Sequence, residues 1–276
     1  MDLSEAVADA RHEVAPWIER LARVGFAAKA LLYMTVGVLA ASAALGFRGH
    51  RAADQHGAML TLVQERYGQL LLAAIALGLL GYAVWRIIEG ITDPEHHGRS
   101  AKGIALRLRS VVIGGIHLAL ALSAAKLAVS GHDAHGGGRD AEVWTARAFA
   151  TPGGTLVVTI VAGGFIGYGV YQLYCALDAK LSKRLSLGGM QDHTRRAVIA
   201  ISRLGIASRG IVFGMIGVLF LRAANHGNPH EAGSVSKSLR ALTDLGTWPF
   251  VAIAVGLVAY GLYQLINARY RRISIG

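Results

Sequence analysis

A short motif of five residues in the first apolar stretch of the chain recurs, at the same spacing, in the fifth apolar stretch. The first copy consists of Arg23, Gly25, Lys29, Tyr33 and Gly37, and the second consists of Arg203, Gly205, Arg209, Phe213 and Gly217. A weaker copy lies between them, with Arg107, Gly114 and His117 at the positions of Arg203, Gly210 and Phe213. Three related segments predict a triplicated architecture, because each repeat of such a chain forms one structural unit.

Six uncharged apolar runs indicate that these units lie in a membrane. The composition is 53% hydrophobic and only 16% charged. Residues 67–85, 148–177 and 245–268 contain no Asp, Glu, Lys or Arg, and each run can cross about 30 Å of hydrocarbon as a helix. Three shorter runs, 30–47, 110–125 and 210–221, each border a basic residue whose stem can reach the interface. We therefore predict an all-α membrane protein with six transmembrane helices.

The second helix of each pair repeats as well, so the repeating unit is a helical hairpin. Gly78 and Tyr82 recur as Gly164 and Tyr168 and again as Gly256 and Tyr260. The predicted units are hairpin 22–92, hairpin 104–178 and hairpin 200–270. Because each unit crosses twice, all three enter from the same side, as parallel repeats around a pseudo-threefold axis.

The tripled hairpin, the Arg-x-Gly start of the odd helices and the Gly-x-x-Gly/Ala-Tyr pattern of the even ones resemble a known family. It is the bacterial membrane family catalogued as domain of unknown function 1206, and the resemblance covers almost everything from Arg20 to Arg269. It implies three pairs of transmembrane helices and carries no established activity. Repeat two departs most, with Ile113 at the place of Lys29 and Arg209.

The net charge of +11 is explained by topology. Most Lys and Arg residues fall on the side that holds both termini and the loops between hairpins, which the positive-inside rule places in the cytoplasm. We expect a multi-pass protein of the bacterial cytoplasmic membrane, with anionic lipid beside its inner loops and no nucleic-acid partner. The sequence indicates no oligomeric state.

Residues 1–21 predict an amphipathic helix, because apolar residues recur at steps of three and four among acidic and basic ones. It is expected to lie along the inner membrane surface. Docking of a protein partner is the alternative.

Small residues predict where helices touch, since in lipid they allow backbones to approach closely. The chain has 35 glycines. The packing positions are Gly78, Gly163, Gly167, Gly256, Gly210 and Gly214. The alternative is a glycine-lined pore.

Basic residues near the inner ends of the odd helices are candidates for a pathway, because a cation inside the membrane is costly. Lys29, Arg209 and Arg107 would form the inner mouth, with Tyr33 and Phe213 one turn deeper. Snorkelling of these cations to the headgroups is the alternative. His117 lies mid-span, where it is either a proton-sensitive gate or a neutral imidazole hydrogen-bonded between helices.

Six histidines fall in the three outer loops, two in each: His50, His56, His132, His135, His226 and His230. Three converging loops could present imidazoles to zinc or copper, although histidine is also ordinary in polar turns. The single cysteine, Cys175, excludes a disulfide within the chain.

No catalytic motif is present, so we do not expect an enzyme, and the residues identify no cofactor. Two functions remain. One is a conduit along the axis for a small solute or ion, with a positive inner mouth that favours anions. The other is an accessory or structural membrane protein that binds lipid or a larger complex.

Overall fold

The computed structural model describes residues 3–46, 54–92, 98, 100–131, 140–178, 190–242 and 246–270. All regular structure in these residues is helical. The long helices are α1 (Leu3–Ala44), α3 (Gly68–Thr92), α4 (Ala101–Ser130), α6 (Gly154–Leu177), α7 (Asp192–His226) and α9 (Thr247–Tyr270). The short ones are α2 (Gln55–Leu62), α5 (Asp140–Phe149), the 3₁₀ helix η3 (Pro229–Glu231) and α8 (Val235–Ala241).

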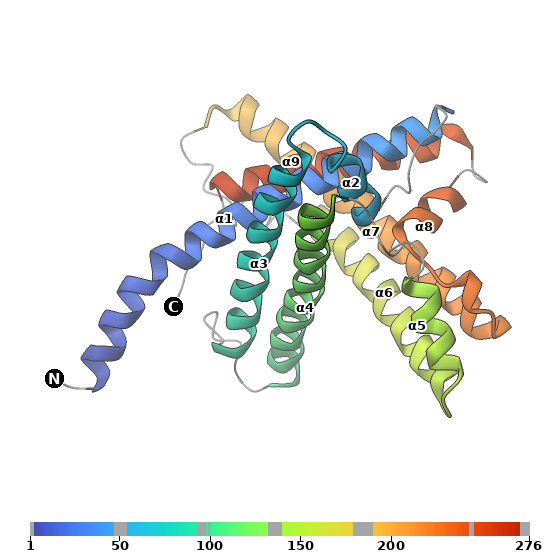
Figure 1. The fold of residues 1–276 in the computed structure, drawn as a ribbon, viewed down its shortest axis with the longest axis horizontal. Helices are drawn as coiled ribbons and strands as arrows, with labels where there is room; N and C mark the ends of the chain where they lie inside the picture. The colour runs from blue at the N-terminus through green and yellow to red at the C-terminus, as the bar shows by residue number, and fades with distance from the viewer. Residues whose placement is uncertain are drawn as a thin grey trace.

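Six of these helices are long and apolar enough to cross a membrane, as the sequence predicted. They are α3, α4, α6, α7, α9 and residues Ala22–Ala44 of α1. Helix α1 begins at Leu3, so the expected N-terminal helix 1–21 is continuous with the first span. Figure 1 shows this part of α1 extending beyond the other helices. The chain is therefore a multi-pass membrane protein in contact with lipid.

The helices follow one another as three hairpins, and the described residues of each turn form one or two short helices. Asp54 caps α2 by accepting from the backbone N–H of Gly57 at 2.8 Å, and Ser234 caps α8 by accepting from that of Lys237 at 3.2 Å. We call the end of the bundle with α2, α5, η3 and α8 the short-helix end. The opposite end, where α3, α6 and α9 finish, is the terminal end.

The most extensive helix contacts join one repeat to the next. They pair α3 with α4, α6 with α7, and α1 with α9, and Figure 1 shows α3 and α4 side by side. Small residues hold the three pairs in the same register. A Cβ atom added at Gly114 would lie 3.0 Å from Ala83 O, and one added at Gly169 would lie 2.7 Å from Gly210 O. A Cβ atom added at Gly261 would lie 2.8 Å from Ala30 O. These three glycine contacts involve matching positions of the repeats, so the repeats pack on one another alike.

Within the hairpins, α1 packs on α3 and α7 packs on α9, whereas α4 and α6 are not joined by a comparable contact. Gly78 lies against α1, where an added Cβ would be 3.0 Å from Val24 O, and Gly256 lies against Ser208 of α7. In Figure 1, α6 diverges from α4. Repeat two therefore forms an open hairpin.

Two of the glycines predicted to lie in helix contacts, Gly163 and Gly167, do not lie in a contact between the described helices. Both are exposed, and a Cβ atom at either would meet no described residue within 4 Å. Gly169 takes that role, because an added Cβ there would lie 2.7 Å from the backbone nitrogen of Gly214 and equally close to Gly210 O. Gly210 and Gly214 thus pack on the neighbouring repeat.

Arg109 gives the physical reason for the open hairpin. Repeats one and three carry Gly25 and Gly205 at this position, and a Cβ atom on either would clash with the facing Tyr82 or Tyr260. An arginine cannot enter such a contact, since even its Cβ has no room there. Helices α4 and α6 therefore stay apart.

Candidate functional site

A cavity of about 430 Å³ lies at the centre of the bundle. Helices α1, α2, α3, α4, α6, α7 and α9 all contribute residues to its wall. Its volume falls in the usual range of ligand sites, roughly 300 to 1,000 Å³. The residues that the sequence singled out for a pathway can be placed against this cavity.

Lys29 and Arg209 line the cavity and are only 5% and 9% exposed. The Lys29 ammonium lies 4.2 Å from the centroid of the Tyr82 ring, a distance at which cation and π-system attract. Neither side chain is extended to the surface of the bundle. They point inward, and the snorkelling alternative does not describe their placement.

Arg209 is held by aromatic residues from two other repeats. Its Nε donates to the hydroxyl of Tyr33 at 3.2 Å, and its Nη1 donates to that of Tyr168 at 2.9 Å. The guanidinium also lies 4.5 Å from the centroid of the Phe213 ring. Tyr33 and Phe213 thus line the cavity beside this cation. These contacts fix the guanidinium without neutralising its charge.

Arg86 is a third buried cation of the cavity wall. Its Nε donates to the Tyr82 hydroxyl at 3.0 Å, and its Nη1 forms an ion pair with Glu89 at 2.5 Å. Arg86 and Glu89 are three residues apart on one helix, a spacing that favours such a local pair. The place of Arg86 in the cavity depends on the packing of α3 against α1 and α4.

Arg109 also lines the cavity, and sequence reasoning missed it. Its Nη1 donates to the hydroxyl of Tyr171 at 3.3 Å, across the open side of repeat two. Its Nε is buried and has no hydrogen-bond partner among the described residues. A buried donor left unpaired is costly, so this nitrogen favours a ligand that can accept from it.

Charge in the cavity is unbalanced. Among the described residues, Arg86 forms an ion pair with a carboxylate, whereas Lys29, Arg109 and Arg209 form none. Asp178 reaches the wall as well. Buried positive charge without a partner is strongly unfavourable, and an anion placed among these groups would offset it.

His117 lies in the cavity wall and is buried. Its Nδ1 is 2.7 Å from the carbonyl oxygen of Ile113, and because a carbonyl can only accept, Nδ1 carries the proton. Ile113 itself lines the cavity at the place of Lys29 and Arg209. Repeat two therefore contributes an apolar residue where the other two contribute cations.

Arg107 does not line the cavity, which corrects its expected place at a mouth. Its guanidinium donates to the carbonyl oxygens of Gly90 at 2.9 Å and Ile91 at 2.7 Å, in the last turn of α3. Arg23 makes the matching contact with Ala268 O at 2.7 Å. In repeats one and two, the arginine at this position thus caps the last helix of the neighbouring repeat.

The described outer-loop histidines bind separate partners at the short-helix end. His226 contacts Glu231 at 2.9 Å, His230 contacts Glu142 at 3.1 Å, and His56 lies 3.5 Å from the hydroxyl of Ser123. Within the part of the chain that the structure describes, no three metal-ligating side chains gather. His50, His132 and His135 lie outside the described residues, so metal binding by the full set stays a prediction.

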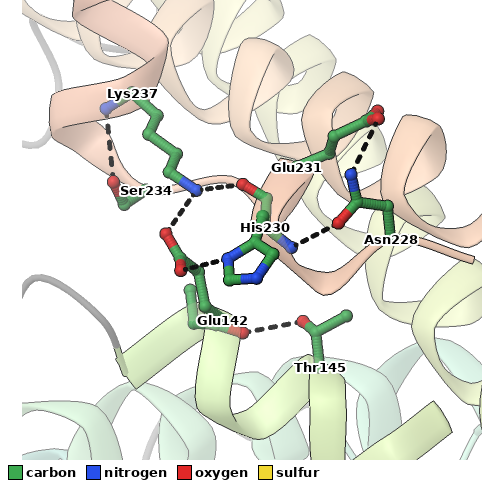
Figure 2. Close-up of polar contacts among 8 residues, drawn as sticks. Glu142, Thr145, Asn228, His230, Glu231, Ser234 and Lys237 are labelled. Atoms are coloured by element: carbon green, nitrogen blue, oxygen red, sulfur yellow. Dashed lines mark hydrogen bonds and ion pairs between the residues drawn. The ribbon is translucent and has the colours of Figure 1, made fainter.

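Figure 2 shows the cluster around Glu142, which joins α5 of repeat two to η3 and α8 of repeat three. Lys237 contacts the Glu142 carboxylate at 2.6 Å, and His230 contacts its second oxygen. Hydrogen bonding to Lys237, together with His230, lowers the pKa of the Glu142 carboxyl. This cluster ties two hairpins together away from the cavity.

Comparison with known proteins agrees with the tripled hairpin. A family model described as Domain of Unknown Function (DUF1206) matches residues 24–93, 109–178 and 204–271. The "Uncharacterized protein YxxB" of Bacillus subtilis (strain 168) is 29% identical over 266 residues, which cover 96% of this chain and 95% of that protein. No solved structure matches the chain. Each match to the family model spans one hairpin, and the chain therefore belongs to the DUF1206 family, a domain of unknown function.

Proposed function

We propose that the protein binds an anion inside the membrane, in the central cavity, as the selective site of an anion-favouring conduit. The observation that carries this proposal is the unbalanced charge of the cavity. Lys29, Arg209 and Arg109 converge there without an ion-pair partner among the described residues. In a medium of low dielectric, each of these cations attracts an anion far more strongly than it would in water.

The arrangement of the repeats supports a path along a pseudo-threefold axis. The repeat-to-repeat contacts share one register, and the cavity touches both helices of every repeat. Lys29, Ile113 and Arg209 occupy the same place in their repeats and all line the cavity. On this proposal the path passes between these three positions. It then reaches Gln55 of α2, whose amide lies 3.5 Å from the Tyr33 hydroxyl.

Replacing both Lys29 and Arg209 with Leu tests the proposal. Halide flux into vesicles that contain the purified protein should fall several-fold, because two charges that attract the ion are removed. Lys126→Leu is the matched control, since Lys126 is exposed on α4 and does not line the cavity. Unaltered flux in a folded double variant would favour the accessory, lipid-binding function instead.

Ile113→Lys provides the opposite change at the matching position of repeat two. A third cation among the axial positions should strengthen anion binding, seen as a larger rise in melting temperature when the anion is added. Ile113→Met controls for side-chain length without charge. An assembled Ile113→Lys protein that the anion stabilises no better than Ile113→Met would argue against an axial site.

The orientation in the membrane is part of the proposal. Basic residues on the terminal side support cytoplasmic termini in a bacterial cytoplasmic membrane, with the start of α1 along its inner surface. In a Cys175→Ser background, Ser130→Cys should react with an impermeant thiol reagent from outside the cell, and Ser100→Cys should not. Both serines are exposed, so the difference reports the side of the membrane.

A further inference from the structure

The cavity opens sideways, between α4 and α6. Of the described residues in its wall, those that are exposed at the surface of the bundle all belong to these two helices. They are Val112 and Ile116, 52% and 54% exposed, Val161, 41% exposed, and Gly164. We call these four residues the portal. Because they lie within membrane-spanning segments, the portal faces the hydrocarbon of the bilayer.

The portal exists because repeat two has Arg109 at the position where Gly25 and Gly205 allow the other two hairpins to close. Gly78 and Gly256 are covered by α1 and α7, whereas a Cβ atom added at the matching Gly164 would meet nothing within 4 Å in the described part of the chain. Arg109, at the place of Gly25 and Gly205, keeps α4 away from it. The same substitution that opens the side of the cavity adds a cation to its wall.

The rim and the interior of the cavity differ in chemistry. The portal consists of apolar side chains and a glycine, with no polar side chain to hold a hydrated ion. Behind it, Arg209 is bound to Tyr168, which lies one helical turn from Gly164. A ligand that fills both regions has a charged part and an apolar part.

The depths of the arginines and of the portal in the membrane also fit a ligand with a charged part and an apolar part. Arg109 lies in the third turn of α4 and Arg86 in the last two turns of α3, both near the terminal end. Val112 and Ile116 follow Arg109 toward the middle of α4. A headgroup held by the arginines would therefore lie near one membrane surface, with its tail directed through the portal into the hydrocarbon.

We infer that the anion is the phosphate headgroup of an amphiphile, which enters from the bilayer and leaves its apolar tail between α4 and α6. This inference rests on the proposed anion site and names its ligand class. The guanidiniums of Arg109 and Arg209 and the ammonium of Lys29 suit phosphate, because arginine donates in a planar fork that matches phosphate oxygens. A volume of about 430 Å³ accommodates a headgroup while the tail remains outside.

Ligand-induced thermal stabilisation in detergent micelles distinguishes the tailed ligand from free phosphate. Two probes are compared, inorganic phosphate and phosphatidic acid. Phosphatidylcholine, whose zwitterionic headgroup has no net charge, is the control. In Gly164→Trp, the indole should fill the portal and weaken the response to phosphatidic acid at least tenfold, while the response to inorganic phosphate persists. Gly163→Trp is the matched control, since Gly163 is equally open but does not line the cavity.

Each failure has its own signature. If phosphatidic acid stabilises the parent no better than inorganic phosphate, the tailed ligand is wrong and the anion site stands. If neither probe stabilises the parent, the anion site itself is wrong. Equal loss of both responses in Gly164→Trp would contradict entry through the portal, because the change would then act on the headgroup site.

A second measurement uses the unaltered chain. Phosphatidic acid with a photoreactive group in its acyl chain should cross-link to residues 112–116 and 161–164 in phosphatidylcholine vesicles. Excess unlabelled phosphatidic acid should suppress these cross-links. Labelling spread over the lipid-facing surface of α3 and α9 as strongly as over the portal would overturn the inference.

Discussion

Arg107 at the start of repeat two donates to the carbonyl oxygen of Gly90 at 2.9 Å, in the last turn of the helix that ends repeat one. Arg23 makes the same contact with Ala268, which closes the chain of repeats from the third back to the first. These arginines satisfy carbonyls that a helix end leaves without partners. Arginines that begin two of the odd helices thus cap the ends of even helices in the neighbouring repeats.

Arg107→Ala should destabilise the bundle by about 1 kcal/mol or more, because two carbonyls lose a charged donor. Arg107→Lys should recover only part of the loss, since an ammonium lacks the fork that reaches both oxygens. The melting temperature in detergent measures both, with Arg196→Ala on the exposed start of α7 as the control. Halide flux should be unchanged in any Arg107 variant that folds, because Arg107 lies outside the cavity wall. A loss of flux in a variant as stable as the parent would mean that Arg107 lies on the ion pathway.

Gly169→Leu should destabilise the protein by about 1 to 3 kcal/mol, because its side chain would overpack the contact with Gly210 and Gly214. Gly163→Leu, six positions earlier on the same helix, should have little effect, since an added Cβ there meets open space. The two melting temperatures are compared in one detergent. Equal losses in both variants would mean that α6 is rotated from the orientation described.

The repeats, the six spans and the family could be predicted from the sequence, because each depends on composition and spacing alone. The rotation of α6 could not. Its glycines occur on two faces, and Gly163 with Gly167 gives as regular a stripe as the one that contains Gly169. Which face packs is decided by the partner helix, which no pattern within α6 reveals.

The cavity was predictable in part. Lys29 and Arg209 stand out because cations are rare inside spans, whereas Arg86 has a charge partner three residues away, Glu89, which accounts for it without a cavity. The signal for Arg109 was present in the repeat alignment, where it replaces Gly25 and Gly205. Reading the alignment for glycines that are lost, as well as for those that recur, would have found it.

Glu142→Gln should lower stability at neutral pH by at most about 1 kcal/mol, because the ion pair with Lys237 is partly exposed. The pKa of the Glu142 carboxyl is lowered in the folded protein, so its stabilising effect is present above the unfolded value, near 4.5. That effect is lost as the pH falls through the lower folded value. Melting temperatures of parent and variant should therefore converge on acidification, whereas Glu65→Gln, on an exposed turn, should match the parent throughout. A difference that grows toward acid would contradict this sign.

Arg109→Gly should close the hairpin of repeat two. In the other two hairpins, the glycine at this position allows a close helix contact, with Gly25 of α1 against Tyr82 and Gly205 of α7 against Tyr260. The matching tyrosine of repeat two is Tyr168 on α6. Closure would bring α4 over Gly164, which now meets nothing within 4 Å, and would remove the sideways opening of the cavity.

The single cysteine reports this change without any engineered label. Cys175 lines the cavity and is half-buried, so a membrane-permeant maleimide should reach it through the portal in the parent protein. In Arg109→Gly, labelling should slow several-fold, because the small residue restores the backbone approach that two of the three hairpins already use. Arg109→Lys keeps a long side chain at the position and should label at the parent rate. Unchanged labelling in a folded Arg109→Gly protein would show that Arg109 does not hold α4 and α6 apart, and that the opening is fixed by the contacts of these helices with α3 and α7.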